Sequence, residues 1–583
     1  MTERKSDLDL LKDLQSYQKS LAAVKNYYEP VMEELIEFCN HTRRKINDTN
    51  KGTVTGQNVY DGTANSANKI QADGFFGNLC SQSLRWFSES LPVKYDFPRW
   101  SNMRKWSGKR LDDIPEVKAW LEACDDVLYS AFLRSNFYDE QPVFYRDGGS
   151  VGCANKYVEE DVKKGRLVIT TLHPREYVVA LDAMGNVDTE FRTYKLTLKQ
   201  LKEKFGEDAL KEDMPNFKQS FEKNPYEEKE IVHAVLPRAD YDPGKKDNKN
   251  KPWASFWYFP NGKRVLLESG YEHFPFIHWQ FNRGNDGYGY GPGHEAYVEI
   301  MLANQQAQSN LVAGQKMVEP PMVVHNNLRG MVQVGPKGRT YVNDMNTMRP
   351  APLMEDIKLP YALDMLDRTE RIIRERWNVD FFLMLSRLAL ENRNITATQV
   401  IEMMGEKATM LGTVVGRIAN DELNPLIDLF FYAEQAAGRI PAMPQIMLDS
   451  GLTNANIEID YTGPLAMAQK RAHATQGIRQ GLATLGEILP LFPQARHKIK
   501  MGQTLDKLLI SIGFPASCLT SEDEFNAAVE AENKQMQEAQ AMEQMKSIGS
   551  ALPGLGKAIE PNSPAEMLVE GMGGKLKGQE AVE

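Results

Sequence analysis

One short segment has the residue pattern of a nucleophilic serine. Gly148-Gly-Ser150-Val-Gly152 matches Gly-x-Ser-x-Gly, in which small neighbours allow a sharp strand-to-helix turn to expose the hydroxyl. The residues that follow do not favour a helix, no His-Gly-Gly-Gly run offers an oxyanion hole, and no particular histidine is indicated as the base. We therefore favour an ordinary glycine turn, and an enzyme built on Ser150 remains the alternative.

Two other glycine-rich segments raise the question of phosphate binding. Residues 284–293 lie between a strand-like run and a helix, where backbone amides can bind an anion. Gly287-Tyr-Gly289 is followed by Pro292 where a dinucleotide motif needs glycine, and Lys575 is followed by Leu576 where a P-loop needs a hydroxyl. We interpret residues 284–293 as a flexible joint and expect no nucleotide or other cofactor.

The metal-binding and redox residues form no recognisable site. The five cysteines are widely spread, which argues against a disulfide framework and for folding in a reducing cytoplasm. His273 and His278 would point to opposite faces of a strand, so we expect packed or surface histidines and no metal. The first residues lack a signal peptide and no apolar run approaches ~18 residues, so we expect no membrane partner.

Composition limits the class of protein. With 583 residues, of which 42% are hydrophobic and 25% charged, the chain can fold into roughly three to five lobes. A net charge of -10 argues against a protein that wraps nucleic acid, because such binding depends on lysine and arginine at phosphates. An acidic conduit that lets DNA pass without gripping it remains compatible with this charge.

Hydrophobic periodicity predicts helices first and strands later. Helices are expected over Leu8–Arg44 with a break near Pro30, over Ala72–Leu91 and over Ile114–Phe137, with a loop at Asn47–Ala67. From Pro142 to Trp279, short β-branched and aromatic runs predict a β-rich lobe with one helical insertion near Leu196–Phe205. Within that lobe, Tyr241–Asn250 is expected to be an exposed hairpin tip.

The helix expected next is polar on almost every side. It extends from about His294 to Lys316 and ends before Pro320-Pro321, because proline lacks an amide and clashes with the preceding turn. A helix of this kind usually packs against copies of itself or borders water. Its polar residues include Asn304, Gln305 and Gln308.

A small module then separates this helix from a second one. Residues 322–356 contain two β-like runs, Met322–Val324 and Met331–Val334, and a Gly335-Pro-Lys-Gly338 turn. Helical spacing resumes over Leu359–Trp377. The pattern is therefore helix, compact module, helix.

The remaining chain is predicted to be mainly helical. A loop at Glu391–Asn394 precedes a capping box at Thr396–Gln399, and a long helix follows to about Ala437 with a kink at Pro425. A strand is expected at Ile457–Tyr461, and helices at Leu465–Leu489 and Leu505–Ile512. The glycine- and proline-containing end is expected to be mobile.

Five short motifs in a fixed order carry a resemblance that covers about Leu10 to Glu530. They are Tyr288-Gly-Tyr-Gly-Pro-Gly-His-Glu-Ala296, Leu302-Ala-Asn-Gln-Gln-Ala307, Gln315-Lys-Met-Val-Glu-Pro-Pro-Met322, Asn394-Ile-Thr-Ala-Thr-Gln-Val400 and Tyr461-Thr-Gly-Pro-Leu-Ala466. Together they resemble the head-to-tail connecting, or portal, proteins of podovirus-type phages.

The resemblance implies a predominantly helical α+β fold that assembles as a ring. Its parts would be a wing, two stem helices around a clip, a tunnel loop and a crown. The implied boundaries are 1–141 for the helical wing, 142–292 for the β-rich wing, 293–320 for the first stem helix, 321–357 for the clip, 358–378 for the second stem helix, 379–395 for the tunnel-loop region, 396–438 for the long wing-to-crown helix, 439–521 for the crown and 522–583 for a C-terminal helix and tail.

The resemblance also implies a function and partners. Twelve copies would form a ring at one capsid vertex of the virion, after assembly in the host cytoplasm, and double-stranded DNA would pass through the ring without sequence recognition. The partners would be the large terminase subunit, tail or adaptor proteins, and the major capsid and scaffolding proteins. A different virion protein, such as a tail or adaptor component, is the alternative.

Three sets of residues are candidates within this scheme, and no catalytic residue is among them. Lys337, Arg339 and Tyr341 would contact terminase or adaptor, or would be ordinary solvated turn residues. Arg387, Asn392 and Arg393 would face DNA, or would cap the next helix or pair with Glu391. Asn304, Gln305 and Gln308 would lie between neighbouring subunits.

Overall fold

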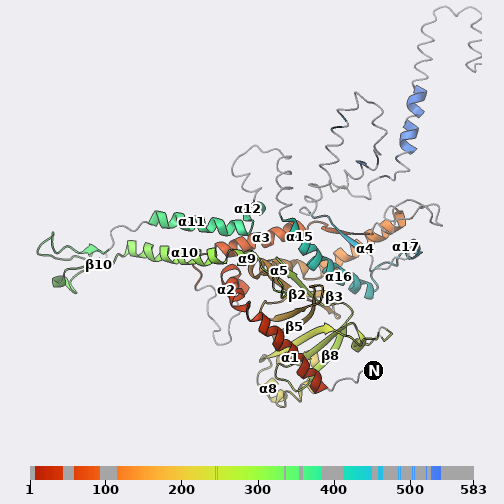
Figure 1. Ribbon diagram of the computed structural model, residues 1–583, viewed down its shortest axis with the longest axis horizontal. Helices are drawn as coiled ribbons and strands as arrows, with labels where there is room; N and C mark the ends of the chain where they lie inside the picture. The colour runs from red at the N-terminus through yellow and green to blue at the C-terminus, as the bar shows by residue number, and fades with distance from the viewer. Residues whose placement is uncertain are drawn as a thin grey trace, which may run out of the picture. The chain divides into compact units, whose positions relative to one another are not determined.

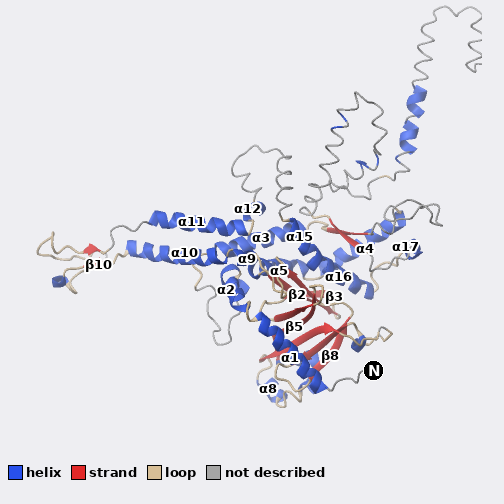
Figure 2. Ribbon diagram, in the orientation of Figure 1, coloured by secondary structure: helices blue, strands red, loops and turns tan. Residues whose placement is uncertain are grey.

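The computed structural model describes most of the chain up to residue 463. The described residues are 7–43, 58–91, 114–333 apart from 243 and 246, 337–353, 359–383, 411–449 and 457–463, with short stretches between 484 and 539. The chain divides into two compact units, residues 1–476 and 477–583. In the second unit nearly all described residues are helical. The first unit mixes helices and strands, as expected for an α+β protein (Figures 1 and 2).

The N-terminal helices are α1 (Asp7–Lys25) and α2 (Glu29–Cys39), so the expected break before Pro30 is confirmed. Pro30 lies in the first turn of α2, where a missing amide costs no helical hydrogen bond. At the end of α1 the buried Lys25 ammonium donates to the carbonyls of Pro174 and Tyr177. This contact ties the helix to the β-rich part of the chain. A 3-10 turn, His41–Arg43, follows α2.

The helix expected at Ala72–Leu91 has different limits. Helix α3 (Thr63–Leu79) begins earlier, inside the expected loop, and residues 87–90 form strand β1 (Phe87–Ser90). β1 pairs antiparallel with β12 (Glu458–Tyr461). The prediction of helix failed at β1 because the strand partner is far away in the sequence, whereas β12 itself was expected as a strand. Helix α4 (Pro115–Arg134) confirms the third expected helix.

The β-rich region begins later than expected. Residues 142–151 form the end of helix α5 (Phe137–Val151), with Pro142 inside it. Gly148 lies against the Trp279 ring, and a Cβ built there would be 2.1 Å from the indole. Close packing of this glycine-containing helix on a strand overrides local propensity. The expectation of strands from Pro142 was therefore wrong, and strands begin at Cys153.

The strands form two main antiparallel sheets. A three-stranded sheet has the order β3-β2-β9, from β2 (Cys153–Asp161), β3 (Arg166–Thr171) and β9 (Phe276–Gln280). A five-stranded sheet has the order β4-β5-β6-β7-β8, from β4 (Tyr177–Leu181), β5 (Val187–Thr197), β6 (Glu228–Pro237), β7 (Trp253–Tyr258) and β8 (Val265–Tyr271). The expected exposed tip, 241–250, connects β6 to β7 and contains a 3-10 turn at Asn248–Asn250.

Helices cover both faces of the five-stranded sheet. Leu11 and Leu14 of α1 pack with Val232 and Phe256, whereas Ile231 and Trp257 pack with the helices inserted after β5. Neighbouring residues of one strand point to opposite faces, so the two clusters lie on opposite sides of the sheet. The inserted helices are α6 (Leu198–Phe205), which was expected, and α7 (Glu207–Leu210) and α8 (Phe217–Lys223), which were not.

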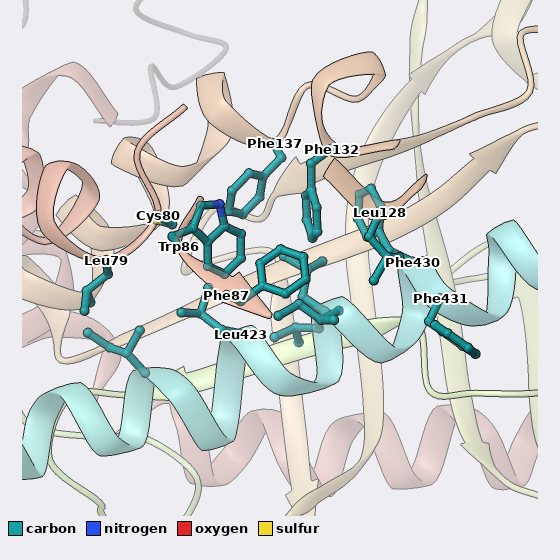
Figure 3. Close-up of a cluster of buried hydrophobic side chains, with 14 of the residues drawn as sticks. Leu79, Cys80, Trp86, Phe87, Leu128, Phe132, Phe137, Leu423, Phe430 and Phe431 are labelled. Carbon is teal, nitrogen blue, oxygen red and sulfur yellow. The ribbon is translucent and has the colours of Figure 1, made fainter. Parts of the chain in front are cut away.

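The largest hydrophobic cluster joins distant parts of the chain (Figure 3). Trp86 packs on Phe87, Phe132 and Phe137, and Phe132 stacks on Phe430 with ring centroids 4.1 Å apart. Phe430 belongs to α16 (Asn424–Ala436), which follows α15 (Gly412–Arg417) and a π-helical turn at Ile418–Leu423. The irregularity expected at Pro425 is therefore a π turn, next to a proline that cannot donate to the preceding turn. A short helix, α17 (Gln445–Asp449), lies beyond.

Two long helices surround the small module, as expected. After α9 (Pro292–Glu295), α10 (Tyr297–Val318) and α11 (Leu359–Arg376) lie side by side, followed by α12 (Val379–Phe382) (Figure 1). Strand β10 (Met322–Val323) pairs antiparallel with β11 (Ala351–Pro352), and a 3-10 turn occupies Asn326–Leu328. The first β-like run is confirmed. The second was wrong for residues 331–333, because β10 takes its partner from the end of the module.

The glycine-rich segment 284–293 is tightly packed, so its interpretation as a flexible joint was wrong. Asn282 and Tyr290 form a β-bridge, and the following glycines lie against the end of α5. A Cβ at Gly291 would be 2.7 Å from the Gly148 carbonyl oxygen, and one at Gly293 would be 2.1 Å from that of Ser150. Glycine is needed here because two backbone segments approach each other directly.

Candidate functional site

The serine motif is not exposed for catalysis. Ser150 is buried in the last turn of α5, and its hydroxyl donates to the Asp147 carbonyl at 3.0 Å. Gly152 ends the helix with a left-handed φ of 76°, the conformation that glycine adopts most easily. The favoured reading as a plain glycine turn is corrected as well: Gly148–Val151 is helical and only Gly152 turns the chain.

His278 is packed and His273 lies at the surface, in agreement with the expectation of packed or surface histidines. His278 Nε2 is 2.7 Å from the Gly287 carbonyl oxygen, and burial lowers the His278 pKa to about 4. His273 stacks on Tyr432 with ring centroids 3.9 Å apart. Among the described residues, no group of three or more His, Cys, Asp or Glu side chains is arranged to hold a metal ion. Within the same residues, no helix combines the length and apolar character needed to span a bilayer.

We call α10 and α11 the stem, and their contacts set an antiparallel register. Near the base, Ile300 and Ala303 of α10 share a buried cluster with Ile373 of α11 and with Trp377, which directly follows α11. The Thr369 hydroxyl is 3.1 Å from Gln306 Oε1 in the middle of the pair. Further out, Asn310 Nδ2 donates to the Ala362 carbonyl at 3.4 Å. The stem is thus apolar at its base and held by polar contacts further along.

The three stem candidates have different environments. Asn304 Oδ1 accepts from the Tyr60 amide at 2.7 Å and the Asp61 amide at 3.3 Å, and its Nδ2 donates to the Asn58 carbonyl at 3.0 Å. Asn304 therefore holds the segment that leads into α3 of its own chain. Gln305 and Gln308 are exposed. The expected place of Asn304, Gln305 and Gln308 between subunits stays a prediction.

Large apolar side chains are exposed along the outer stem. Leu311 is 53% and Val312 40% exposed near the end of α10, and Leu363 is 47% exposed on the facing helix. Such a concentration is unusual for a surface that stays in water. The exposed apolar residues of the stem are Val298, Leu302, Leu311, Val312, Met317, Val318, Tyr361, Leu363 and Met365.

Of the clip expected at residues 321–357, the structure describes 321–333 and 337–353, and this part buries very little. Leu328 is its only buried residue among 322–333 and 337–353. The clip is held by polar contacts between nearby residues, such as the hydrogen bond that the Gln333 backbone amide donates to Thr340 Oγ1 at 3.0 Å. A module of this size without a core does not offset its own chain entropy. The described part of the clip therefore has little stabilisation of its own.

The three clip candidates lie on one exposed loop. Lys337 has a left-handed φ of 67°, the Arg339 amide donates to Gln333 Oε1 at 3.3 Å, and Tyr341 is 81% exposed. The described clip carries four basic residues and one acidic residue, although the whole chain has a net charge of -10. The loop thus presents positive charge and an aromatic ring to solvent.

Some candidates lie outside the described residues. They include Arg387, Asn392 and Arg393, and also Glu391, the capping box at Thr396–Gln399 and most of the region expected to form a crown. Sequence reasoning also missed the buried ion pair between Lys156 and Glu422. Gln141 Nε2 donates a hydrogen bond of 3.0 Å to the same glutamate. Neither residue has a signal in the local sequence, since the partners are brought together only by tertiary packing.

Comparisons with known proteins agree on one group. A family model described as bacteriophage head to tail connecting protein matches residues 11–519. The portal protein of Salmonella phage epsilon15 is 28% identical over 542 residues, which cover 90% of this chain and 92% of that protein. The probable portal protein of Bordetella phage BPP-1 is 28% identical over 477 residues, covering 80% and 81% of the two chains.

Proposed function

Because the chain belongs to the bacteriophage head-to-tail connecting protein family, we propose that its copies assemble through the stem and clip into a closed ring of twelve. The protein is a phage portal, a structural and non-enzymatic component of the virion at a capsid vertex. The proposal includes the division into wing, stem, clip and crown with the boundaries given above. The number twelve rests on the family resemblance.

The exposed apolar surface of the outer stem is the observation that carries the ring proposal. Leu311, Val312 and Leu363 are well exposed on a helix pair whose contacts with the same chain are already made at its base. Burying apolar surface contributes about 25 cal/mol for each Å² removed from water. A closed ring covers this surface on every copy at once, with one contact repeated around the axis.

The ring would form the channel for DNA packaging and ejection. The net charge of -10 suits a wall that does not hold phosphates, because like charges repel. Within this scheme Arg387, Asn392 and Arg393 would face the DNA. Contact would then be confined to a few positions and would not depend on base sequence.

The clip would be the docking platform for the other machines of the vertex. Its basic and aromatic loop, with Lys337, Arg339 and Tyr341, suits an acidic protein surface on terminase or on a tail or adaptor protein. The major capsid and scaffolding proteins would contact the ring elsewhere. Gln305 and Gln308 would form hydrogen bonds between neighbouring stems.

Paired substitutions test the ring and the clip separately. We expect Leu311→Ser with Val312→Ser to prevent ring formation in negative-stain images, because each change removes apolar area from the repeated contact. Met184→Ser with Val162→Ser removes two apolar residues of the β-rich region that are even more exposed, at 84% and 80%, and should leave rings intact. Lys337→Glu with Arg339→Glu should give rings that no longer bind terminase. Equal ring yields from the two serine pairs would contradict the stem assignment.

A further inference from the structure

A cavity of about 430 Å³ lies beside the π turn and is not explained by ring assembly. Its walls come from the turn between β4 and β5, from β9 and the residues around it, and from the helix that includes the π turn and α16. All of these elements belong to the first compact unit.

The lining offers hydrogen-bond acceptors and aromatic faces. Asp421 and Asp428 contribute carboxylates from the π turn and α16. The Nδ1 atom of His278 is buried and has no hydrogen-bond partner, while Nε2 of the same ring is 2.7 Å from the Gly287 carbonyl oxygen. The stacked rings of His273 and Tyr432 form an aromatic wall. Acceptors and π faces together suit a cation.

The charge of the lining is negative by one unit when both carboxyls are ionised. Arg283 is the only lysine or arginine among the residues that line the cavity, and its Nη2 is 3.5 Å from Asn186 Oδ1. Arg417 also lies nearby and donates to the Phe281 carbonyl at 2.5 Å and to Asn282 Oδ1 at 2.9 Å, and the charges of Arg417 and Arg283 act on Asp421 in the direction that lowers its pKa. Burial raises the pKa of both Asp421 and Asp428. A bound cation would favour the ionised carboxylates.

The π turn is the local feature that presents Asp421 to the cavity. The next residue, Glu422, is fully buried and pairs with Lys156 and Gln141 on another side of the helix. The Tyr461 hydroxyl holds Asn424 Oδ1 at 2.5 Å just after the turn. Turns of this kind are rare and occur often at functional sites. The π turn therefore favours a functional role for the cavity independently of its lining.

We propose that this cavity binds a guanidinium or ammonium group between Asp421, Asp428 and the rings of His273 and Tyr432. Two sources have this chemistry: a basic side chain of a neighbouring copy, which rests on the proposed ring, and a free small organic cation. In both cases the carboxylates neutralise the charge and the rings contact the flat or alkyl part of the group.

Agmatine, which carries both groups, is the probe, and butylurea is its uncharged control. Saturation-transfer NMR on the full chain should show contact for agmatine and none for butylurea. Asp421→Asn with Asp428→Asn should weaken agmatine binding roughly tenfold or more, because the charge is lost while side-chain shape is kept. Asp73→Asn with Asp240→Asn removes exposed carboxylates elsewhere and should not change binding. Thermal unfolding of both variants shows whether they fold.

Comparison of dispersed chains with assembled rings separates the two sources. The dispersed sample is the Leu311→Ser, Val312→Ser variant. Contact with dispersed chains alone identifies a neighbour's basic side chain as the occupant in rings, and contact with both samples identifies a free cation. Failure of agmatine to contact folded dispersed chains overturns the cation site, and it leaves the ring proposal intact. Absence of rings from the unmodified protein would instead count against the proposed function.

Discussion

Two buried carboxyl groups next to the main hydrophobic cluster are the clearest pH-dependent feature at the residue scale. Glu89 and Asp125 are both buried, and the Glu89 amide donates to Asp125 Oδ1 at 2.9 Å. Burial, and then the charge of the neighbouring carboxyl, raise the pKa of Glu89 from 4.5 to about 8. Burial also raises the pKa of Asp125 to about 7. Glu89 Oε2 has no hydrogen-bond partner.

The raised pKa of Glu89 makes the stability of the folded protein fall as pH rises. The folded protein keeps the Glu89 proton above pH 4.5, where the unfolded chain releases it, so the stability contribution is full below pH 4.5 and is lost as pH rises towards 8. Glutamine carries no titrating proton, so the variant Glu89→Gln should not lose this contribution. Between pH 4.5 and 8 its free energy of unfolding, relative to that of the unmodified protein, should therefore rise by up to about 1.4 kcal/mol per pH unit. Urea unfolding at several pH values measures the difference.

The control for this prediction is Glu116→Gln, since Glu116 is exposed on the same helix as Asp125. Its stability should follow the unmodified protein at every pH. If the difference in unfolding free energy between Glu89→Gln and the unmodified protein stays constant between pH 5 and 8, the pKa of Glu89 is not raised in the folded protein.

Single residues were the part of the site least open to prediction. The three hydrogen bonds by which Asn304 holds residues 58–61 of its own chain were not expected, and its expected place between subunits stays a prediction. Ser150 fits a catalytic pattern and is buried in a helix. The partners of Asn304 come from a segment far away along the chain, whereas Ser150 is buried because it lies inside α5, a helix that the local sequence does not favour.

At the scale of elements, two glycine motifs that look like separate functional patterns form one packing contact. Gly148 and Gly152 at the end of α5 lie against Gly289 and Gly291, with backbone next to backbone. This contact places α9 against α5. The stem therefore starts from a closely packed base.

We expect Gly291→Ala to destabilise the protein by about 1–3 kcal/mol, the usual cost of inserting a methyl group into a filled space. The new Cβ would lie 2.7 Å from the Gly148 carbonyl oxygen and 2.9 Å from the Gly152 Cα, both backbone atoms. Gly416→Ala in α15, with open space at its Cβ, should be neutral or stabilising by up to about 1 kcal/mol. Chemical denaturation compares the two, and equal stability would refute close backbone packing.

Periodicity predicts long elements better than short paired ones. The helices α4, α10 and α11 were expected close to their observed limits, because each keeps helical spacing over several turns. Strand β1 and the pairing of β10 with β11 were missed, because a strand of two to four residues depends on its partner. Helix α5 was missed because Pro142, Gly148 and Gly149 hide its pattern.

For the whole molecule, the order of weak motifs predicts more than any single element. The family match over residues 11–519 confirms the portal assignment, although neither composition nor charge points to it. The sequence also indicates the helix, module, helix arrangement, and the structure adds that the outer stem and clip expose apolar surface. Among the described residues nothing covers that surface, and the proposed ring would bury it.

The most direct test of this account is the symmetry of the purified, full-length protein, obtained by electron microscopy of particles in capsid-like salt. Ring assembly predicts annular particles whose end-on averages show twelve repeated subunits, with the stem and clip of neighbouring copies in contact. A stable monomer or dimer under the same conditions would contradict it.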